Sequence, residues 1–288
     1  MDGLYVASAT PYRQDNTLNL VVLEEMTKHH IAQGASGFFA GGSSGECFLL
    51  SESERIAVFE AACNFKDKTD IIAHVGAIST EESIRYAKAA KSFGAQYISA
   101  TPPFYYGFTS AQIAQYFYDI SSAVDMPIMV YNFPINTGKS FDLSNPDIAN
   151  LLRSDAVWGI KHTNLDLFQF ERIRNLNPKL VMMNGYDETM IAGLVLGGVG
   201  SIGSSFNIML PLWLKICDAF KSGNLGDALK LQTKANNIME TLYRVGLISA
   251  IKYILTTQGF EMGEPRKPFA PLTQEQRNVV DEVLRACL

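Results

Sequence analysis

The sequence predicts an α/β protein of the (β/α)8 TIM barrel class with a C-terminal helical extension. Short apolar runs alternate with helix-like patterns from the N-terminus, and eight such pairs precede residue 221 or so. The runs are apolar throughout rather than alternating, which is typical of parallel strands that are buried on both faces. Eight strand–helix pairs in one chain are the signature of a closed barrel.

The first half of the chain supplies four of the expected strands. We predict them at residues 4–9, 37–40, 70–75 and 97–100. A helix over residues 20–33 ends at a glycine. The next helices open at Ser51, Ser79 and Thr109, which begin the patterns Ser-Glu-Ser-Glu, Ser-Thr-Glu-Glu and Thr-Ser-Ala-Gln. The first two have the form of a capping box, in which a hydroxyl and a carboxylate three residues later satisfy free backbone N–H groups.

The second half supplies the other four strands. We predict them at residues 128–131, 156–161, 180–183 and 200–202. Asn145-Pro146 starts a short helix with proline in its first turn. Residues 165–176 form the next helix, because Leu165, Phe168, Ile173 and Leu176 fall on one helical face. A further helix runs from about residue 188 to 196. The glycine-rich stretch 197–203 lacks the spacing of a dinucleotide motif and indicates tight strand packing.

The last part of the chain is helical. Helices are predicted over residues 225–245 and 248–257, and Thr273 caps another. No Ser/Gly-rich linker precedes them. We therefore expect residues 1–221 to form the barrel and residues 222–288 to pack on it as an extension.

Composition excludes several classes of protein. The chain of 288 residues is 47% hydrophobic and 18% charged, which is enough for a full core. A net charge of -5 without a basic run argues against a nucleic-acid partner. No apolar stretch reaches the roughly 20 residues of a membrane helix, and no signal peptide is visible. The four cysteines are scattered, so they indicate free thiols and a cytoplasmic protein.

Polar side chains gather where the predicted strands end. In barrels of this class, the active site lies at the C-terminal ends of the strands. Residues of separate stretches should therefore converge in space. They are Ser43, Ser44, Tyr105, Tyr131, Lys161, Thr163, Asp187, Glu188, Ser204 and Asn207.

Lys161 ends a buried strand, where desolvation penalises its charged form and lowers its pKa. A neutral amine is the species that attacks a ketone to form a Schiff base. The alternative is a packed stem with the amine in solvent. The expected convergence of polar residues favours the catalytic interpretation. Lys252 is a rival, but it lies in a helical pattern outside the barrel, where we expect its amine to reach solvent.

Residues 41–45 match G-x-S-x-G, the nucleophile elbow of serine hydrolases. An elbow leads straight into a helix, whereas the segment Cys47-Phe48-Leu49-Leu50 intervenes here before the cap at Ser51. The alternative is an anion cradle, because backbone N–H groups in a Gly/Ser turn and the hydroxyls of Ser43 and Ser44 suit a carboxylate.

Three further residues have two interpretations each. Tyr131 is either a half-buried strand-end tyrosine or a proton carrier near the lysine. Asp187 and Glu188 start a helix, where the helix dipole favours acidic residues. In a barrel mouth, they would instead repel a phosphorylated substrate and suit a polyhydroxyl one. Four dispersed histidines argue against a metal site.

Five motifs, in this order and spacing, resemble the pyruvate-dependent class I lyase family that includes dihydrodipicolinate synthase and N-acetylneuraminate lyase. They lie at residues 9–11, 41–46, 101–106, 131–134 and 159–163. Within the family, residues 184–188 and 203–207 are similar to the N-acetylneuraminate lyases. Asn136 stands where the synthase pattern has an arginine, which disfavours a synthase.

The resemblance implies a fold, a reaction and an assembly. Lys161 would form a Schiff base with the ketone of open-chain N-acetylneuraminate, so that no other cofactor is needed. Cleavage would give N-acetylmannosamine and pyruvate, with Tyr131 relaying the proton. Ser43 and Ser44 would hold the carboxylate. The sugar hydroxyls would be bound by Thr163, Gly185, Asp187, Glu188 and Ser204. The family implies a homotetramer in which Tyr105, or its neighbour Tyr106, reaches the adjacent subunit's site.

Other functions remain open at this point. The chain could be another pyruvate-handling member of the family, such as a synthase or a sugar-acid aldolase, or a non-catalytic barrel that binds sugar acids. Intact Lys161 and Tyr131 argue against the binding protein, and Asn136 argues against the synthase. A serine hydrolase is the most distant alternative.

Overall fold

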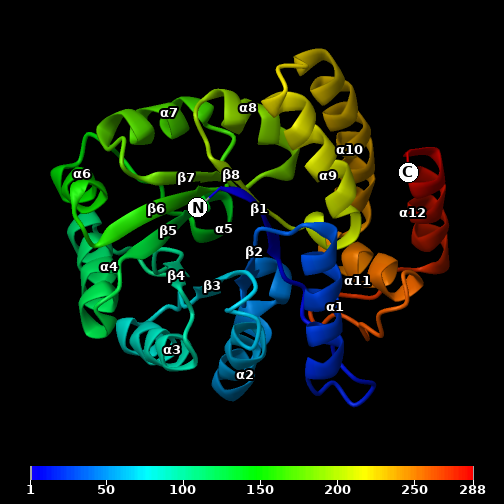
Figure 1. Ribbon diagram of the computed structural model, residues 1–288. Helices are drawn as coiled ribbons and strands as arrows, with labels where there is room; N and C mark the ends of the chain where they lie inside the picture. Colours follow the sequence, from blue (N-terminus) through cyan, green and yellow to red (C-terminus); the bar gives the residue numbers. More distant parts are fainter. Residues whose placement is uncertain (1, 288) are drawn as a thin grey trace.

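The computed structural model describes residues 2–287 and contains a closed barrel of eight parallel strands (Figure 1). Neighbours along the chain are neighbours in the barrel, and the last strand pairs with the first. The predicted fold class is confirmed. The strands are β1 (Gly3–Ala7), β2 (Gly37–Ala40), β3 (Asp70–His74), β4 (Tyr97–Ala100), β5 (Ile128–Asn132), β6 (Val157–His162), β7 (Val181–Asn184) and β8 (Gly200–Gly203).

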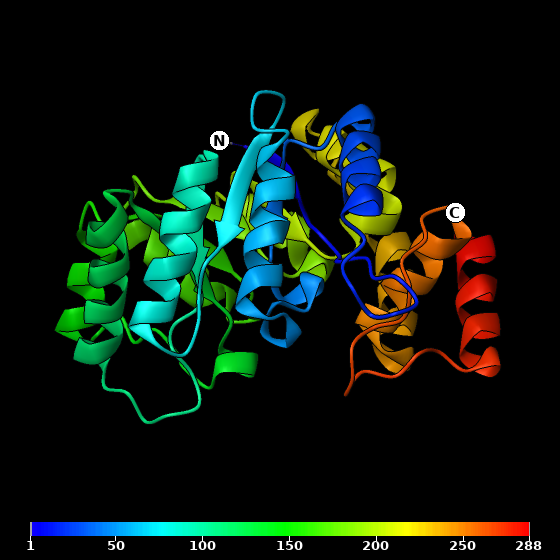
Figure 2. The same ribbon diagram turned by 90° about the horizontal axis from the view of Figure 1, so that it is seen from below.

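A layer of helices surrounds the barrel, as Figures 1 and 2 show from two directions. Three short 3₁₀ turns follow strand ends and were not predicted: η1 (Ser43–Gly45), η2 (Cys47–Leu49) and η3 (Asp187–Thr189). The α-helices up to residue 221 are α1 (Leu20–Gln33), α2 (Glu52–Cys63), α3 (Thr80–Phe93), α4 (Ser110–Val124), α5 (Pro134–Thr137), α6 (Pro146–Arg153), α7 (Leu167–Leu176), α8 (Met190–Val195) and α9 (Phe206–Lys221).

The helix caps follow the predicted chemistry with one exception. Ser51 and Thr109 form complete capping boxes with Glu54 and Gln112. At Ser79, only half of the predicted box forms, because its hydroxyl accepts from the Glu82 N–H at 3.2 Å but the reciprocal bond is not made.

The predicted apolar face of residues 165–176 was wrong at its N-terminal end. Leu165 and Phe168 are 70% and 74% exposed, whereas Phe170 and Ile173 are buried. The Asp166 side chain accepts a hydrogen bond from Gln169 N at 2.8 Å, so the helix starts at Leu167 and Leu165 lies outside it. Leu165 and Phe168 therefore form an apolar surface rather than core.

The barrel closes where β8 meets β1. A Cβ added to Gly200 would lie only 2.0 Å from the carbonyl oxygen of Gly3, so no larger residue fits there without a backbone shift. This close approach confirms that the glycine-rich stretch serves tight strand packing.

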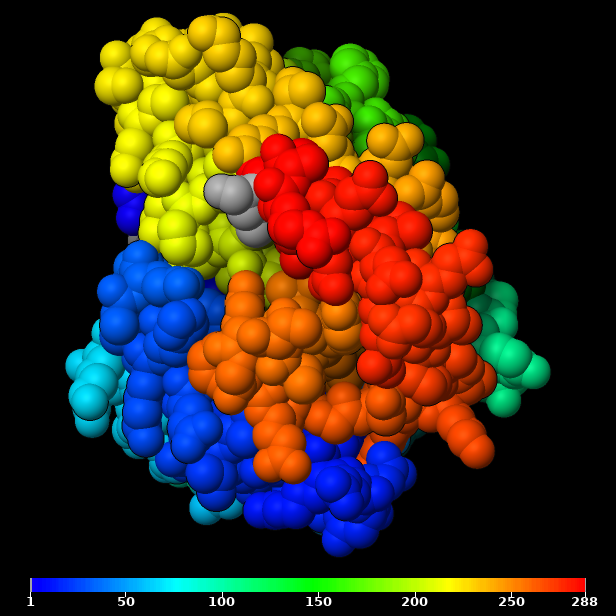
Figure 3. All heavy atoms as spheres, turned by 90° about the vertical axis from the view of Figure 1, so that its right-hand side faces the viewer, coloured from blue at the N-terminus to red at the C-terminus, as the bar shows by residue number. Residues whose placement is uncertain are grey.

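Three helices follow the barrel: α10 (Leu225–Val245), α11 (Leu247–Thr257) and α12 (Gln274–Cys287). Helix α10 packs along α9 and α12, with Ala235 and Leu242 fully buried. Figure 3 shows the C-terminal segment, in orange and red, lying against α9 and α10 and the N-terminal region. The extension also reaches the carboxyl ends of the strands, because Gln232 of α10 donates to the carbonyl oxygen of Asp187 at 3.1 Å.

Among the helices of residues 2–287, none combines the length and apolar character needed to span a bilayer. All four cysteines lie in this described range and none is in a disulfide; Cys47, Cys63 and Cys217 are buried.

Candidate active site

A cavity of about 420 Å³ opens at the carboxyl ends of the strands. It brings together seven of the eleven residues that the sequence singled out for the site: Ser43, Ser44, Tyr131, Lys161, Thr163, Gly185 and Ser204. They come from five different strand ends, as a barrel site requires. Asp187, Glu188, Tyr105 and Asn207 do not line it. The buried Asn207 side chain instead binds the backbone after β1, donating to Ala7 O at 2.8 Å and accepting from Ala9 N at 3.1 Å.

Lys161 points into the barrel from β6 and is 4% exposed. Its Nζ lies 4.2 Å from the ring centre of Phe39 and 4.1 Å from that of Tyr131. Burial lowers the pKa of Lys161 to about 7, against a smaller opposing effect of Asp187. A substantial fraction of neutral amine is therefore present at neutral pH, which is what imine formation needs.

Tyr131 is the neighbour of Lys161 in the β5–β6 register. It is buried, its ring is stacked on Phe133 at 5.5 Å, and its hydroxyl lies 3.5 Å from Ser43 Oγ. Burial raises the pKa of Tyr131, and the hydroxyls of Ser43 and Thr163 act in the opposite direction. The phenol is therefore protonated at neutral pH and can donate.

The predicted anion cradle corresponds to η1. Ser44 Oγ and Ser204 Oγ share a hydrogen bond of 2.6 Å, which ties the loops after β2 and β8 together. The Thr10 hydroxyl donates to the carbonyl oxygen of Gly45 at 2.7 Å and fixes the end of the turn. The first N–H groups of a helical turn have no partner within it. Together with the hydroxyls of Ser43 and Ser44, they form a site that suits a carboxylate.

The same loop is not a nucleophile elbow. A second 3₁₀ turn, η2, separates it from α2, and the histidine that contacts it is His74, at the carbonyl oxygen of Gly41. The nitrogens of His74 face Arg55 Nη2 at 2.9 Å, Gly41 O at 3.1 Å and Thr101 N at 3.4 Å, rather than a serine. Burial, followed by the charge of Arg55, lowers the pKa of His74 well below its ordinary value.

Asp187 lies behind the cavity wall. Ser205 donates to its Oδ2 from both its backbone N–H, at 2.9 Å, and its hydroxyl, at 2.6 Å. Its Oδ1 is buried and has no hydrogen-bond partner among residues 2–287. Burial, followed by the charge of Glu188, raises the pKa of Asp187 to about 7. The buried Oε2 of Glu188 likewise has no partner in that range. Two under-bonded carboxyls thus stand directly after Tyr186, which lines the cavity.

Tyr105 lies at the surface. It is 84% exposed and has a φ of +76°, a left-handed conformation that is strained for a residue other than glycine. Its neighbour Tyr106 is also exposed. Within one chain, neither tyrosine reaches Lys161.

His162, next to the lysine, faces the outside of the barrel. Asn132 Nδ2 donates to its Nδ1 at 3.1 Å, and its Nε2 lies 3.1 Å from the carbonyl oxygen of Asp166. Burial lowers the pKa of His162 to about 4, so the ring is neutral at neutral pH. His162 therefore joins β6 to α7 and takes no part in the cavity.

The C-terminal extension supplies a wall that the sequence did not predict. Tyr243, Leu247 and Ile248 line the cavity beside Lys161. They come from α10 and α11, whose packing against the barrel mouth depends on tertiary contacts and leaves no local motif. Phe133 and Tyr186, which also line it, follow β5 and β7 and could have been found from their position after strands.

The prediction for the rival lysine was wrong. Lys252 does not reach solvent but is 2% exposed, with its Nζ 2.8 Å from Glu46 Oε1. The helical pattern showed that Lys252 lies outside the barrel, but not that a carboxylate from the loop after β2 meets it in the interior. Lys252 is also outside the cavity of Lys161.

Comparison with known proteins shows similarity over the full chain. Residues 1–287 match the Dihydrodipicolinate synthetase family. The chain is 34% identical to an N-acetylneuraminate lyase of Rhizobium meliloti, over 100% of this chain and 96% of that protein. CdNal of Clostridium difficile, solved in complex with mannosamine, superposes with a TM-score of 0.95 at 31% identity, covering 100% and 99% of the two chains. An N-acetylneuraminate lyase of Fusobacterium nucleatum superposes with a TM-score of 0.93 at 32% identity, and the match covers 100% of this chain and 99% of that chain.

Proposed function

Because the chain belongs to the dihydrodipicolinate synthetase family, we propose that it is a class I aldolase that cleaves N-acetylneuraminate reversibly to N-acetylmannosamine and pyruvate. The observation that carries this proposal is Lys161, a buried amine with a lowered pKa beside Tyr131 and a Gly/Ser turn. The similarity to N-acetylneuraminate lyases over the whole chain supports the choice of substrate.

The reaction begins with imine formation at Lys161. The neutral amine attacks the C2 ketone of the open-chain sugar acid, water leaves, and the resulting imine takes up one proton from the solution to become the protonated imine. Among the residues that line the cavity, Lys161 is the only lysine or arginine, so the imine forms there. The substrate carboxylate accepts hydrogen bonds in the cradle of Ser43 and Ser44, which fixes the ketone near the amine.

Carbon–carbon cleavage then uses the imine as the electron acceptor. The C3–C4 bond breaks, its electron pair forms the enamine, and the C4 hydroxyl loses its proton to become the aldehyde of N-acetylmannosamine. Tyr131 lies beside the lysine and relays this proton. The enamine is then protonated at C3, and water hydrolyses the imine to release pyruvate and regenerate Lys161.

The charge of the cavity supports one carboxylate rather than two. Lys161 is the only lysine or arginine among the lining residues, and its charge is used in the imine. Asn136 lines the cavity where the synthase pattern has an arginine, so a second substrate carboxylate would find no cation. A buried charge without a partner is costly, which disfavours a synthase reaction.

The remaining polar groups suit a polyhydroxyl chain. Thr163 and Ser204 offer hydroxyls at the cavity wall, and Gly185 allows close approach to the backbone. Asp187 and Glu188 carry unpartnered oxygens directly after Tyr186 in the chain. Because they do not line the cavity, we propose that they act on recognition of the sugar hydroxyls indirectly, through the position of Tyr186.

We also propose a homotetramer in the cytoplasm. Two groups of exposed apolar side chains, which we take to be two separate patches, support the assembly. Phe48, Ile78, Tyr105 and Tyr106 follow strands β2 to β4, and Leu165, Phe168 and Val195 lie on or beside α7 and α8. Exposed apolar patches mark interaction sites, and two distinct self-complementary contacts generate a closed tetramer. A cavity of about 550 Å³ next to Ser43 and Phe133 would admit Tyr105 of a neighbouring subunit. The unpaired thiols fit a reducing compartment.

Two assays test the function. Incubation with N-acetylneuraminate should release pyruvate and N-acetylmannosamine in equal amounts. Borohydride added in the presence of pyruvate should reduce the imine to a stable secondary amine, with one pyruvate-derived group per chain mapped to Lys161. Lys161→Ala should abolish the label, whereas the exposed control Lys88→Ala should keep it. A label on another lysine, or none in an active enzyme, would overturn the class I mechanism.

A further inference from the structure

A buried ion pair links the C-terminal extension to the anion cradle. Lys252 of α11 and Glu46, which follows η1 directly, are both almost fully buried, and Lys252 Nζ lies 2.8 Å from Glu46 Oε1. Neither residue lines the cavity of Lys161. The pair is therefore outside the cavity of Lys161. Glu46, however, is next to Gly45, the end of the cradle, and lines the neighbouring cavity of about 550 Å³.

Both carboxylate oxygens of Glu46 are held. Lys252 binds Oε1, and the backbone N–H of Arg266 donates to Oε2 at 2.7 Å. The ring of Tyr12 contacts both cations, with its centre 3.8 Å from Lys252 Nζ and 4.5 Å from Arg266 Cζ. The Glu46 side chain thus has one position, which is fixed by the segment 252–266 and by the loop after β1.

The backbone of Glu46 connects its fixed side chain to the cradle. Glu46 adopts a left-handed conformation, with φ 58° and ψ 34°, which is strained for a residue other than glycine. Its N–H donates to the carbonyl oxygen of Ser43 at 3.1 Å and closes η1. Because the surroundings must hold such a conformation, the contacts of the Glu46 side chain help to determine where Ser43 and Ser44 point.

Stability alone does not account for the pair. Burying two charges costs desolvation, and apolar residues of similar volume often stabilise a protein as much or more. An ion pair whose two partners are both held in place does, however, fix the orientation of their side chains. Among the residues described, Lys252 has no other carboxylate within ion-pair distance, so its amine draws Glu46 toward α11.

We propose that the Lys252–Glu46 pair is a positioning device that holds the cradle of Ser43 and Ser44 in the geometry that receives the substrate carboxylate. This inference rests on the proposed function. The extension then contributes to the active site twice: it supplies a wall of the cavity, and through Lys252 it sets the geometry of the cradle. Pyruvate carries the carboxylate and needs the cradle, whereas N-acetylmannosamine has no carboxylate and does not.

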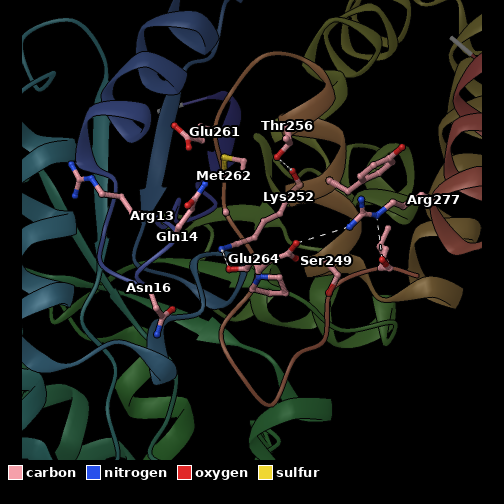
Figure 4. A pocket seen from close by; sticks show the side chains of 14 residues that line it. Arg13, Gln14, Asn16, Ser249, Lys252, Thr256, Glu261, Met262, Glu264 and Arg277 are labelled. Atoms are coloured by element: carbon pink, nitrogen blue, oxygen red, sulfur yellow. Dashed lines mark hydrogen bonds and ion pairs between the residues drawn. The ribbon is translucent and has the colours of Figure 1, made fainter. Parts of the chain in front are cut away.

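Arg277 provides a matched control for Lys252, and Figure 4 shows both residues. Lys252 borders a second cavity of about 420 Å³, between α11, the segment 261–265 and the loop after β1. Arg277 lines the same cavity and carries the same charge, but its guanidinium faces Glu264, at 4.0 Å, and Tyr253 instead of Glu46. Arg277→Met therefore removes a cation from the same cavity without touching the cradle.

The test is steady-state kinetics in the condensation direction, at a temperature well below every variant's melting temperature. For Lys252→Met and for Glu46→Gln, we expect the KM for pyruvate to rise about 10- to 100-fold, while the KM for N-acetylmannosamine and kcat at saturating pyruvate stay within about threefold. Arg277→Met should leave all three unchanged. The pyruvate dependence of borohydride labelling at Lys161 should shift in parallel with its KM.

The double variant Lys252→Met/Glu46→Gln separates positioning from stability. Without a lone buried charge, its melting temperature should recover relative to Lys252→Met, but its KM for pyruvate should stay high because nothing draws residue 46 toward α11. Equal changes in both KM values, a pyruvate KM that recovers with stability, unchanged kinetics, or failure of all three variants to fold would each overturn the proposal. If the wild-type protein is not labelled with pyruvate, the proposed function fails instead.

Discussion

At the scale of single residues, the environment of Lys161 decides its chemistry. Two aromatic rings lie near its amine, and the nearest acidic influence, Asp187, is itself held by Ser205 and has a pKa raised to about 7. A carboxylate paired directly with the amine would keep it charged. Burial without such a pair leaves the lysine reactive, and this could be foreseen only in part, because the sequence places Lys161 in a strand but not among rings.

The pH dependence of imine formation follows from this environment. An ordinary lysine has a pKa near 10.5, whereas burial lowers that of Lys161 to about 7. The charged amine does not attack a ketone, so the rate of imine formation with pyruvate should rise as the pH increases through about 7 and level off above it. Stopped-flow or quenched borohydride labelling between pH 5 and 9 measures this rate. A midpoint near 10, or a rate that falls over this range, would contradict the assignment.

The phenol of Tyr131 permits an equally specific change. Tyr131→Phe removes only the hydroxyl, so that stacking on Phe133 and the edge contact with Phe39 survive. If this hydroxyl relays the proton, kcat should fall by about 10²- to 10⁴-fold, which is the usual contribution of a positioned acid–base group. Borohydride labelling with pyruvate should persist, because it needs the amine but no carbon–carbon cleavage. A kcat close to that of the wild type would remove Tyr131 from the mechanism.

At the scale of elements, the positions of the strands were easier to predict than the surfaces against which the helices pack. Each of the eight predicted strands lies within two residues of its observed bounds, because a continuous apolar run between turn residues is a local signal. The site residues at strand ends followed from that. Leu165 and Phe168 were assigned to a buried face, Lys252 was expected in solvent, and Tyr243 was missed. Each of these depends on which surface meets which, and no window of sequence contains that information.

The closure of β8 on β1 gives an element-scale prediction. In Gly200→Ala, the new Cβ would lie 2.0 Å from the carbonyl oxygen of Gly3, a backbone atom that cannot rotate away. The free energy of unfolding should fall by about 1–3 kcal/mol or more, as for other overpacked sites. Denaturant titration measures it.

Gly226→Ala is the matched control for that change. Gly226 lies in the first turn of α10, where the nearest atom to an added Cβ is 3.9 Å away. Alanine favours a helix over glycine by up to about 1 kcal/mol, so the control should be neutral or slightly stabilising. Equal effects of the two substitutions would argue against a closure that depends on Gly200.

At the scale of the whole molecule, one chain contains most of the cavity but leaves apolar surface without cover. The barrel and its extension together supply Lys161, the cradle and the wall of Tyr243. The division between them near residue 221 stays a prediction. Tyr105 faces outward in a strained conformation on one patch, while Phe168 and Leu165 lie on another. An assembly that covers both patches would relieve this exposure, and it would give Tyr105 a site to enter.

A charge introduced into the patch of Leu165, Phe168 and Val195 should reduce the size of the assembly but not the activity. Phe168→Asp places a charge in the middle of the patch of Leu165, Phe168 and Val195, where desolvating it would be costly. We expect light scattering to show half the wild-type mass and kcat to stay within about threefold, because this patch is distinct from the one that carries Tyr105. Leu229→Asp, an equally drastic change at an exposed leucine of α10 outside both patches, should leave the mass unchanged. A wild-type protein with the mass of one chain, or a Phe168→Asp protein with the wild-type mass, would contradict the proposed assembly.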